Sequence, residues 1–333
     1  MTSAPATPAW REPPSPARAL AAAGVVADAP EVADLSRSHS VHLLAVPGGQ
    51  AYAVKRLRRE AWERGRSLGA ELFVYRLASW SGVLAEVLPQ ALMIDERHQV
   101  LVLRAAGRSP AVATPELARS LGSLVASWHT ATSGVPAPAL ASAGILYLPG
   151  TAPENWGIRT QAAVELGGLV AADPALPGLL EAGAAAWRPL CLVHGDLKWD
   201  NCLVEEGGAG VKDRLRVVDW ELSGFGDPAW DVASVIAEHL AVHREAEPYE
   251  TLESPVISAF MRSYAIGSSL MKHDFERRCA LFTVARLIHL ALEQAEHAGE
   301  AGMAGVADPT VDVARRLGAD TDRLTTLLSG MCR

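Results

Sequence analysis

The chain has 333 residues, a length that predicts two lobes or domains rather than one. Hydrophobic residues make up 49% and charged residues 20%, a balance that is typical of a globular protein and excludes a disordered or fibrous chain. The net charge of -8 disfavours binding to nucleic acid phosphates or anionic lipid, so we expect neither nucleic acid nor a membrane as a partner. The four cysteines show no C-x-x-C spacing and are interpreted as reduced thiols of a cytoplasmic protein.

Residues 1–30 are rich in proline and alanine and contain several prolines before any sustained apolar run. This composition fits neither a secretory signal nor a membrane anchor. Because such a segment can bury little apolar surface to offset the entropy lost on ordering, it is interpreted as a mobile leader.

Residues 31–106 predict a small antiparallel sheet that carries one helix. Two strands, 41–46 and 50–57, flank a Pro-Gly-Gly turn and form a hairpin. The apolar residues of segment 68–88 recur at helical spacing. Two further apolar runs, 91–94 and 100–103, are separated by a polar turn and predict two more strands.

Residues 107–333 predict a larger, mainly helical lobe that begins with a helix at 115–129 and ends with one at 275–298. The apolar spacing of the last helix is typical of a core helix, and Arg286 and Glu293 within it are interpreted as buried partners without assigned chemistry. Together the two regions predict an α+β fold. One short β-type patch interrupts the helical lobe, at 191–193, 202–204 and 215–218.

The segment LVHGDLKWDNCLV places polar residues on a loop between two apolar strands. Phosphoryl transfer needs a carboxylate that orients the attacking hydroxyl and accepts its proton, and oxygen ligands for magnesium. Asp196 and Asn201 fit these two roles, and their spacing equals that of the protein-kinase motif H-R-D-x-x-x-x-N. The alternative is an Asx-rich turn in which both side chains bond to local backbone.

A second segment, LRVVDWELSGFGDPAWDVAS, follows closely. Asp219 ends an apolar strand one hairpin length after Asn201, so we expect it to face the same point and to hold magnesium against the phosphates. Asp227 and Pro228 predict the start of a helix, with the aspartate as N-cap. Asp231 lies in the first turn of that helix and is interpreted as support for the loop rather than as a catalytic group.

These two segments together resemble the aminoglycoside phosphotransferase and choline kinase-like family, whose hallmark is an H-G-D loop followed by D-x-E and G-D-P-x-x-D. The match covers residues 194–233. The resemblance implies a two-lobed protein-kinase-like fold and an ATP- and Mg²⁺-dependent phosphotransferase with an alcohol group as acceptor. Carried over by position, it makes Asp196 the catalytic base, Asn201 and Asp219 the magnesium ligands, and His194 and Asp231 scaffold residues.

Lys198 follows the predicted base by two residues, as does a lysine that reaches the γ-phosphate in protein kinases; a solvated lysine is the equal alternative. Lys55 ends a strand in the manner of the V-A-I-K lysine that holds the α- and β-phosphates, with a surface lysine as the alternative. Glu71 is the best match for the helix glutamate that pairs with this lysine in the family. The loop before the hairpin has no glycine, and Ser36 and Ser38 are the candidates to donate hydroxyls to the phosphates.

The acceptor stays open. Residues 219–253 contain nine acidic residues and one arginine. This negative charge suits a cationic acceptor, but it is also typical of a solvated helix face. The first hypothesis is a kinase for an aminoglycoside-like or other hydroxylated metabolite. The second is a peptide Ser/Thr kinase that acts on a ribosomally made precursor and primes dehydration by a partner lyase, because the motifs look similar to kinase-like members of such natural-product pathways. The third is a pseudokinase that serves as a binding module.

Overall fold

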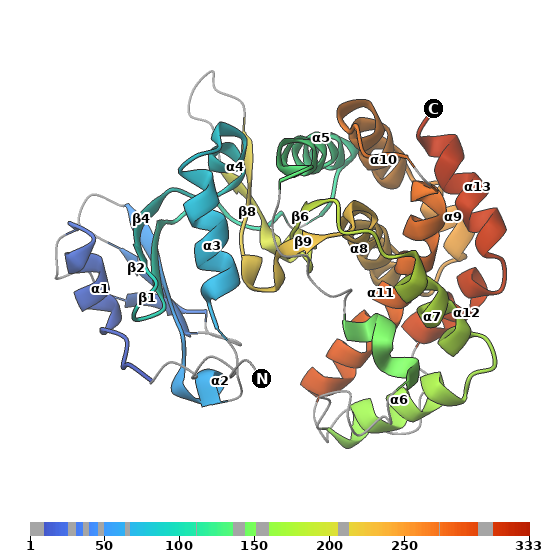
Figure 1. The fold of residues 1–333 in the computed structure, drawn as a ribbon, viewed down its shortest axis with the longest axis horizontal. Helices are drawn as coiled ribbons and strands as arrows, with labels where there is room; N and C mark the ends of the chain where they lie inside the picture. The colour runs from blue at the N-terminus through green and yellow to red at the C-terminus, as the bar shows by residue number, and fades with distance from the viewer. Residues whose placement is uncertain are drawn as a thin grey trace, which may run out of the picture. The chain divides into compact units, whose positions relative to one another are not determined.

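The structure is a computed structural model that describes residues 10–25, 31–35, 40–45, 50–63, 67–110, 112–135, 144–150, 160–205, 213–272, 274–298 and 309–333. The chain divides into two units. Unit 1 comprises Met1–Ser109 and Asn201–Leu222, and unit 2 comprises Pro110–Asp200 and Ser223–Arg333. Figure 1 shows the elements of each unit, and the α+β fold class predicted from the sequence is confirmed.

Unit 1 is built on an antiparallel sheet that, in the described part of the chain, has five strands in the order β1-β2-β3-β5-β4. The hairpin of β2 and β3 pairs Val41 with Lys55, and β3 in turn pairs Lys55 with Leu101 of β5. Alternate residues of a strand point to opposite faces, so each strand serves two packing layers. The strands are β1 (Glu31–Asp34), β2 (Ser40–Ala45), β3 (Ala51–Arg56), β4 (Ala91–Asp95) and β5 (Val100–Arg104).

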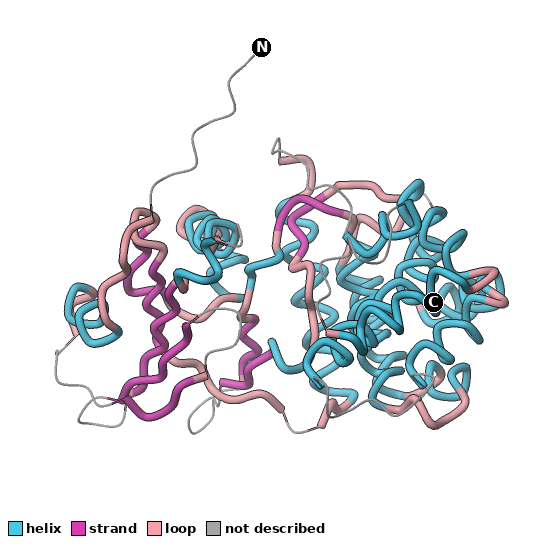
Figure 2. The backbone as a smooth tube through the Cα atoms, turned by 90° about the horizontal axis from the view of Figure 1, so that it is seen from below, coloured by secondary structure: helices cyan, strands magenta, loops and turns pink. Residues whose placement is uncertain are grey.

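Helices lie on both faces of this sheet (Figures 1 and 2). One face packs against α1 (Pro16–Ala22), and the other faces α3 (Gly69–Ala78). On the first face, Leu20 of α1 is buried with Val54 and Val102 of the sheet in one apolar cluster. Two short helices, α2 (Arg59–Glu63) and α4 (Gly82–Val87), complete the first segment of unit 1.

Helix α1 lies inside residues 1–30, the segment expected to be a mobile leader. Ser15 caps the helix by accepting a hydrogen bond from the backbone N–H of Arg18, and Pro16 occupies its first position. Arg56 of β3 donates to the carbonyl oxygen of Pro14 at 2.9 Å. Residues 16–22 therefore differ from the expected leader, because two apolar side chains of a short helix suffice to anchor it when they meet an uncovered sheet face.

A hairpin from later in the sequence also belongs to unit 1, although residues 107–333 were expected to form the second lobe. It consists of β7 (Cys202–Glu205) and β8 (Arg214–Val217). Arg216 donates to the carbonyl oxygens of Glu86 and Leu88, at 2.6 and 3.3 Å. Gly107 has a φ of 52°, and a Cβ there would lie 1.8 Å from the carbonyl oxygen of Val204, so the close approach of the hairpin requires glycine.

Unit 2 is a packed set of helices around α11 (Phe275–Ala298), most of whose residues are buried. Helices α5 and α10 come so close that a Cβ at Gly122 would lie 2.4 Å from the carbonyl oxygen of Phe260. The remaining helices are α5 (Pro115–Thr132), α6 (Gln161–Ala172), α7 (Leu176–Ala186), α8 (Pro228–Val242), α9 (Pro248–Leu252), α10 (Pro255–Gly267), α12 (Pro309–Gly318) and α13 (Thr321–Met331), with a 3₁₀ segment at Gly144–Gly150.

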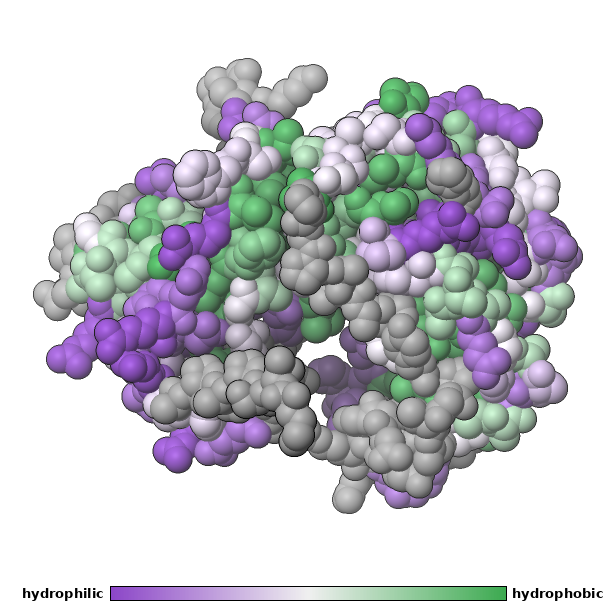
Figure 3. All heavy atoms as spheres, viewed as in Figure 1, coloured by the Kyte–Doolittle hydropathy of each residue, from purple (hydrophilic) through white to green (hydrophobic). Residues whose placement is uncertain are grey.

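A two-stranded ribbon in unit 2, β6 (Cys191–Val193) with β9 (Gly224–Gly226), carries the loop that begins at His194. Among the described residues, no single helix has the length and apolar character needed to cross a membrane; only the bent pair α6 and α7 meets that test, by length and composition. On the face drawn in Figure 3, hydrophobic and hydrophilic residues are interspersed. Trp80 and Ile266 are exposed, and single apolar side chains of this kind are ordinary on a protein surface.

Candidate active site

In unit 1, Lys55 joins three segments that are far apart in the sequence. Its Nζ atom lies 2.6 Å from Oε2 of Glu71 on α3 and 2.5 Å from Oδ1 of Asp219 after β8. The side chains of Lys55 and Glu71 are 8% and 2% exposed, whereas that of Asp219 is 42% exposed. Burial alone would lower the pKa of Lys55, but the charges of Glu71 and Asp219 outweigh it and raise the pKa above its ordinary value. The lysine is therefore a fixed cation beside a solvent-accessible carboxylate.

Asp219 has a left-handed backbone, with a φ of 66°. A non-glycine residue in this conformation is strained, and such strain collects at functional sites. Just before it, the backbone N–H of Val218 donates to the carbonyl oxygen of Asn201 at 2.9 Å, which holds the chain beside both predicted metal ligands. Asn201 is buried at the end of a 3₁₀ turn, Trp199–Asn201.

The donor atoms of Asn201 and Asp219 fit a magnesium ion. The described residues contain no group of three or more His, Cys, Asp or Glu side chains arranged for a metal. Magnesium does not require such a group, because it usually keeps several waters and takes one or two carboxylates plus substrate phosphates. The amide oxygen of Asn201 and the partly exposed carboxylate of Asp219, which pairs with Lys55, are ligands of the kind that such a site uses.

In unit 2, the loop after β6 is held by the first turn of α8. The carboxylate of Asp231 is fully buried and accepts hydrogen bonds from the backbone N–H of His194 at 2.7 Å and of Gly195 at 3.0 Å. His129 of α5 contacts the same carboxylate at 3.1 Å. Gly195 has a φ of 86°, and its carbonyl oxygen accepts from the indole N–H of Trp230 at 2.9 Å. Asp231 thus supports the loop backbone, the part predicted for it.

Asp196 is placed by two cations. Its Oδ1 accepts from Nη2 of Arg286 at 2.8 Å, and its Oδ2 accepts from Nζ of Lys198 at 2.7 Å. The side chain is 12% exposed. Burial alone would raise the pKa of this carboxyl, but the charges of Arg286 and Lys198 hold the pKa well below its usual range. Asp196 is therefore ionised at neutral pH, as a proton acceptor must be.

Further acidic groups lie around this aspartate within unit 2. Glu238 of α8 accepts from the backbone N–H of Trp199 at 2.7 Å, and burial raises the pKa of Glu238 to about 7. Burial also raises the pKa of Glu293 on α11. His289, which contacts both Arg286 and Glu293, is kept neutral because burial and the neighbouring guanidinium lower its pKa to about 3.

The structure brings the predicted site residues together in two groups, each within one unit. Unit 1 joins Lys55, Glu71 and Asp219, with Asn201 at the base of the same hairpin, and unit 2 joins Asp196 to Lys198. Ser36 and Ser38 lie outside the described residues.

The contact between Arg286 and Asp196 was missed from the sequence. Arg286 was interpreted as a buried residue without chemistry, yet its guanidinium meets the predicted base. A charged residue in the apolar run LFTVARLIHL was the available signal, because a buried arginine needs a carboxylate partner.

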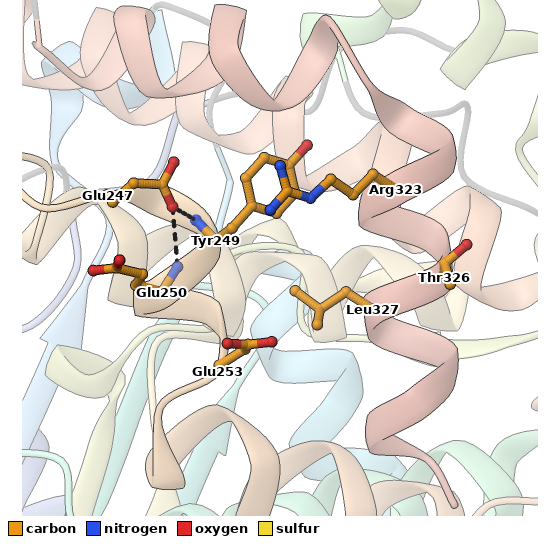
Figure 4. Close-up of a pocket in the computed structure, with 7 residues that line it drawn as sticks. All are labelled: Glu247, Tyr249, Glu250, Glu253, Arg323, Thr326 and Leu327. Carbon is orange, nitrogen blue, oxygen red and sulfur yellow. Dashed lines mark hydrogen bonds between the residues drawn. The ribbon is translucent and has the colours of Figure 1, made fainter.

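A separate pocket of about 560 Å³ lies in unit 2, between α9 and α13 (Figure 4). Arg323 stacks on the ring of Tyr249, 3.8 Å from its centroid, and Glu247 caps α9. Since none of the predicted site residues lines this pocket, we assign it no part in the chemistry. Its lining consists of Glu247, Tyr249, Glu250, Glu253, Arg323, Thr326 and Leu327.

Comparison with protein families gives one decisive finding: the model of the phosphotransferase enzyme family matches residues 16–254. The chain belongs to this family. The family membership confirms the predicted enzyme class, a phosphotransferase with an alcohol group as acceptor. The matched segment includes Lys55, Glu71, the loop from His194 to Asn201, and Asp219. No curated protein sequence gives a significant match.

This phosphotransferase is similar in structure to several kinases. Choline kinase LicA from Streptococcus pneumoniae is 15% identical, with 92% of this chain and 97% of that chain covered and a TM-score of 0.58. A choline/ethanolamine kinase family protein from Mesorhizobium loti is 17% identical, covering 95% and 98% with a TM-score of 0.54. Amicoumacin kinase hAmiN, in complex with AMP-PNP, Ca²⁺ and Ami, is 14% identical, with 89% of this chain and 88% of that chain covered and a TM-score of 0.57. These likenesses confirm the kinase-like fold.

Proposed function

We propose that this phosphotransferase transfers the γ-phosphoryl group of ATP, with Mg²⁺, to a hydroxyl group of a small molecule. The observation that carries the proposal is the position of Lys55 between Glu71 and Asp219, which unites a strand, a helix and a strained turn in one charged group. Structural packing alone does not call for this group, because burying a lysine with carboxylates costs desolvation energy, and apolar residues of similar volume would often be at least as stable.

In the proposal, unit 1 holds the nucleotide. Lys55 binds the α- and β-phosphates, and Glu71 keeps its ammonium group in place. Asn201 and Asp219 would hold the magnesium ion, which neutralises negative charge on the phosphates when bound. Asp219 needs no large movement for this role, since its side chain is already 42% exposed.

Unit 2 supplies the proton acceptor. Asp196 accepts a hydrogen bond from the acceptor hydroxyl, orients that oxygen toward the phosphorus atom and takes its proton. Lys198 contacts Oδ2 of Asp196 in this structure and is 22% exposed. In the proposal, its side chain turns toward the transferred phosphoryl group. Asp196 and Asn201 are five positions apart in the sequence, so the two roles are linked by at most about 18 Å of extended chain.

The acceptor is proposed from charge. Glu238 and Glu293 lie close enough to Asp196 to affect one another's titration, and they would favour a hydroxylated acceptor that carries a positive charge. Kinases of similar structure are also named for hydroxylated small molecules, as choline kinase is. The comparisons give no support to the peptide-directed alternative or to a partner lyase.

The test is transfer of label from γ-labelled ATP with Mg²⁺ to two acceptor pools, one of amino sugars and small amino alcohols and one of Ser/Thr-rich peptides. Asp196→Asn removes the proton acceptor and is expected to lower transfer at least a hundredfold, within the range for loss of a general base. Asp322→Asn, at an exposed position of α13, is the matched control and is expected to keep wild-type transfer.

Label that appears in the first pool and depends on Asp196 supports the proposal. Label in the peptide pool alone would replace it with the peptide-kinase hypothesis. A protein that binds ATP but labels neither pool, nor water as free phosphate, would favour the pseudokinase hypothesis.

A further inference from the structure

Arg286 is a buried cation with a fixed contact to the proposed proton acceptor. Its side chain is 1% exposed, and its Nη2 donates to Oδ1 of Asp196 at 2.8 Å. Lys198 contacts the other oxygen and is 22% exposed, so it is the more solvent-accessible of the two cations. The two cations therefore differ in burial: Arg286 lies in the protein interior, and Lys198 is partly exposed.

The guanidinium is itself held from two further sides. Its central carbon lies 5.5 Å from the ring centroid of Trp230 on α8, within the range of a cation–π contact. The same Trp230 donates its indole N–H to the carbonyl oxygen of Gly195, the residue before Asp196. Phe282, one turn before Arg286 on α11, packs on Trp230 with ring centroids 5.8 Å apart. Arg286 and Trp230 therefore bind adjacent residues of the loop after β6, Asp196 and Gly195.

A short chain of polar contacts along α11 fixes the other edge of the guanidinium. Nη1 of Arg286 donates to Nδ1 of His289 at 2.6 Å, and Nε2 of His289 lies 3.4 Å from Oε1 of Glu293. Residues 286, 289 and 293 share one face of the helix. Because a neutral His289 accepts at Nδ1, it must carry its proton on Nε2, which faces Glu293.

We propose that Arg286 is a positioning residue for phosphoryl transfer: it fixes Oδ1 of Asp196 from behind, so that Oδ2 is the atom that accepts the proton of the attacking hydroxyl once Lys198 has moved away. The inference rests on the proposed function of Asp196. It assigns different tasks to two cations that contact the same carboxylate, and it gives His289 and Glu293 the task of holding Arg286.

Asp196 is surrounded by charges from each element packed around it. Arg286, Lys198 and His194 favour its ionised form, and the carboxyl groups of Glu238 on α8 and Glu293 on α11 oppose it. Of the favourable charges, Arg286 contributes most. Loss of Arg286 should therefore move the protonation of Asp196 to higher pH, an effect that loss of a buried arginine without contact to Asp196 would not produce.

The first readout is the carboxyl ¹³C signal of Asp196, identified by its absence from Asp196→Asn, followed from pH 4 to pH 8. In the wild type we expect it to stay ionised across this range. In Arg286→Gln we expect a protonation midpoint inside the range, shifted up by at least one pH unit. Arg286→Lys retains a charge and should show a smaller shift.

The second readout is the rate of phosphate release from MgATP to water, which needs no identified acceptor. Arg286→Gln should lower kcat at least tenfold and leave the KM for ATP within threefold of wild type, because the nucleotide residues of unit 1 are untouched. The acid limb of its pH profile should move to higher pH together with the ¹³C midpoint.

Arg278→Gln is the matched control. Arg278 lies on the same helix, is 2% exposed and pairs with the buried carboxylate of Asp227 at 2.8 Å. Its loss should cost stability as the loss of Arg286 does, but should leave the ¹³C midpoint of Asp196 in place. Should Arg286→Gln fail to fold, His289→Ala removes one anchor of the guanidinium and is expected to shift the midpoint in the same direction by a smaller amount.

The inference is overturned if Asp196 in folded Arg286→Gln stays ionised to pH 4 as in wild type, or if Arg278→Gln shifts it equally. Absence of Asp196-dependent transfer to both acceptor pools is a different failure, since it would refute the proposed function while the ¹³C titration still measures the coupling of Arg286 to Asp196.

Discussion

Replacing Asp231 with alanine tests how the catalytic loop is held. The substitution removes the acceptor for two buried backbone N–H groups, those of His194 and Gly195, and leaves His129 without its carboxylate. Hydrogen bonds to a charged group contribute about 1.5–3 kcal/mol each, and breaking a buried charged network typically costs about 3–5 kcal/mol. We expect a loss of about 3–5 kcal/mol in the free energy of unfolding of unit 2.

For a domain of this size, each kcal/mol corresponds to about 2–4 °C in Tm, so the melting of unit 2 should fall by about 6–20 °C in differential scanning calorimetry. Asp312→Ala is the control, because Asp312 also lies in the first turn of a helix but is exposed and pairs with a partly exposed arginine. Its expected cost is below about 1 kcal/mol. A loss for Asp231→Ala as small as that of the control would refute the reasoning.

Three further predictions concern other parts of the chain. Lys55→Met should weaken binding of a fluorescent ATP analogue at least tenfold, about 1.4 kcal/mol, and unchanged affinity would contradict its phosphate-binding role. Because burial holds the pKa of Glu238 at about 7, its protonated form stabilises the fold below about pH 4.5, and that stabilisation is lost as the pH rises through 7. In urea titrations, the free energy of unfolding of Glu238→Gln should therefore rise by about 1–2 kcal/mol relative to wild type between pH 4.5 and pH 8, a value reduced for the partial exposure of the side chain. An equal pH dependence of the two proteins would contradict this prediction. Leu20→Ala should cost about 2–5 kcal/mol in urea unfolding of unit 1, and a cost below about 0.5 kcal/mol would show that α1 does not belong to the core.

Much of the site could be predicted because its chemistry is local in sequence. Asp196, Lys198 and Asn201 lie within six residues, and their spacing identifies the loop. Lys55 and Glu71 were found from their place at a strand end and on a helix, and the structure joins them to Asp219. Residue type and spacing suffice for contacts of this kind.

Long-range contacts were beyond prediction for a physical reason. Arg286 meets Asp196 across 90 positions, and nothing in helical periodicity says which carboxylate a buried arginine will meet. Helix α1 was missed although its alanine, leucine and arginine residues favour a helix, because a helix of seven residues is not stable alone and depends on the sheet face that covers Leu20. In both cases tertiary packing decides the structure.

The membership of the β7–β8 hairpin in unit 1 has a consequence for synthesis. The chain completes the first segment of unit 1 at Ser109 and returns to it only at Asn201. At about 5–20 residues per second, roughly 6–23 s pass between synthesis of Ser109 and that of Leu222. During that interval Lys55 and Glu71 exist without Asp219, so a nascent chain cannot assemble the charged group early, and a fragment ending at Ser109 would never assemble it.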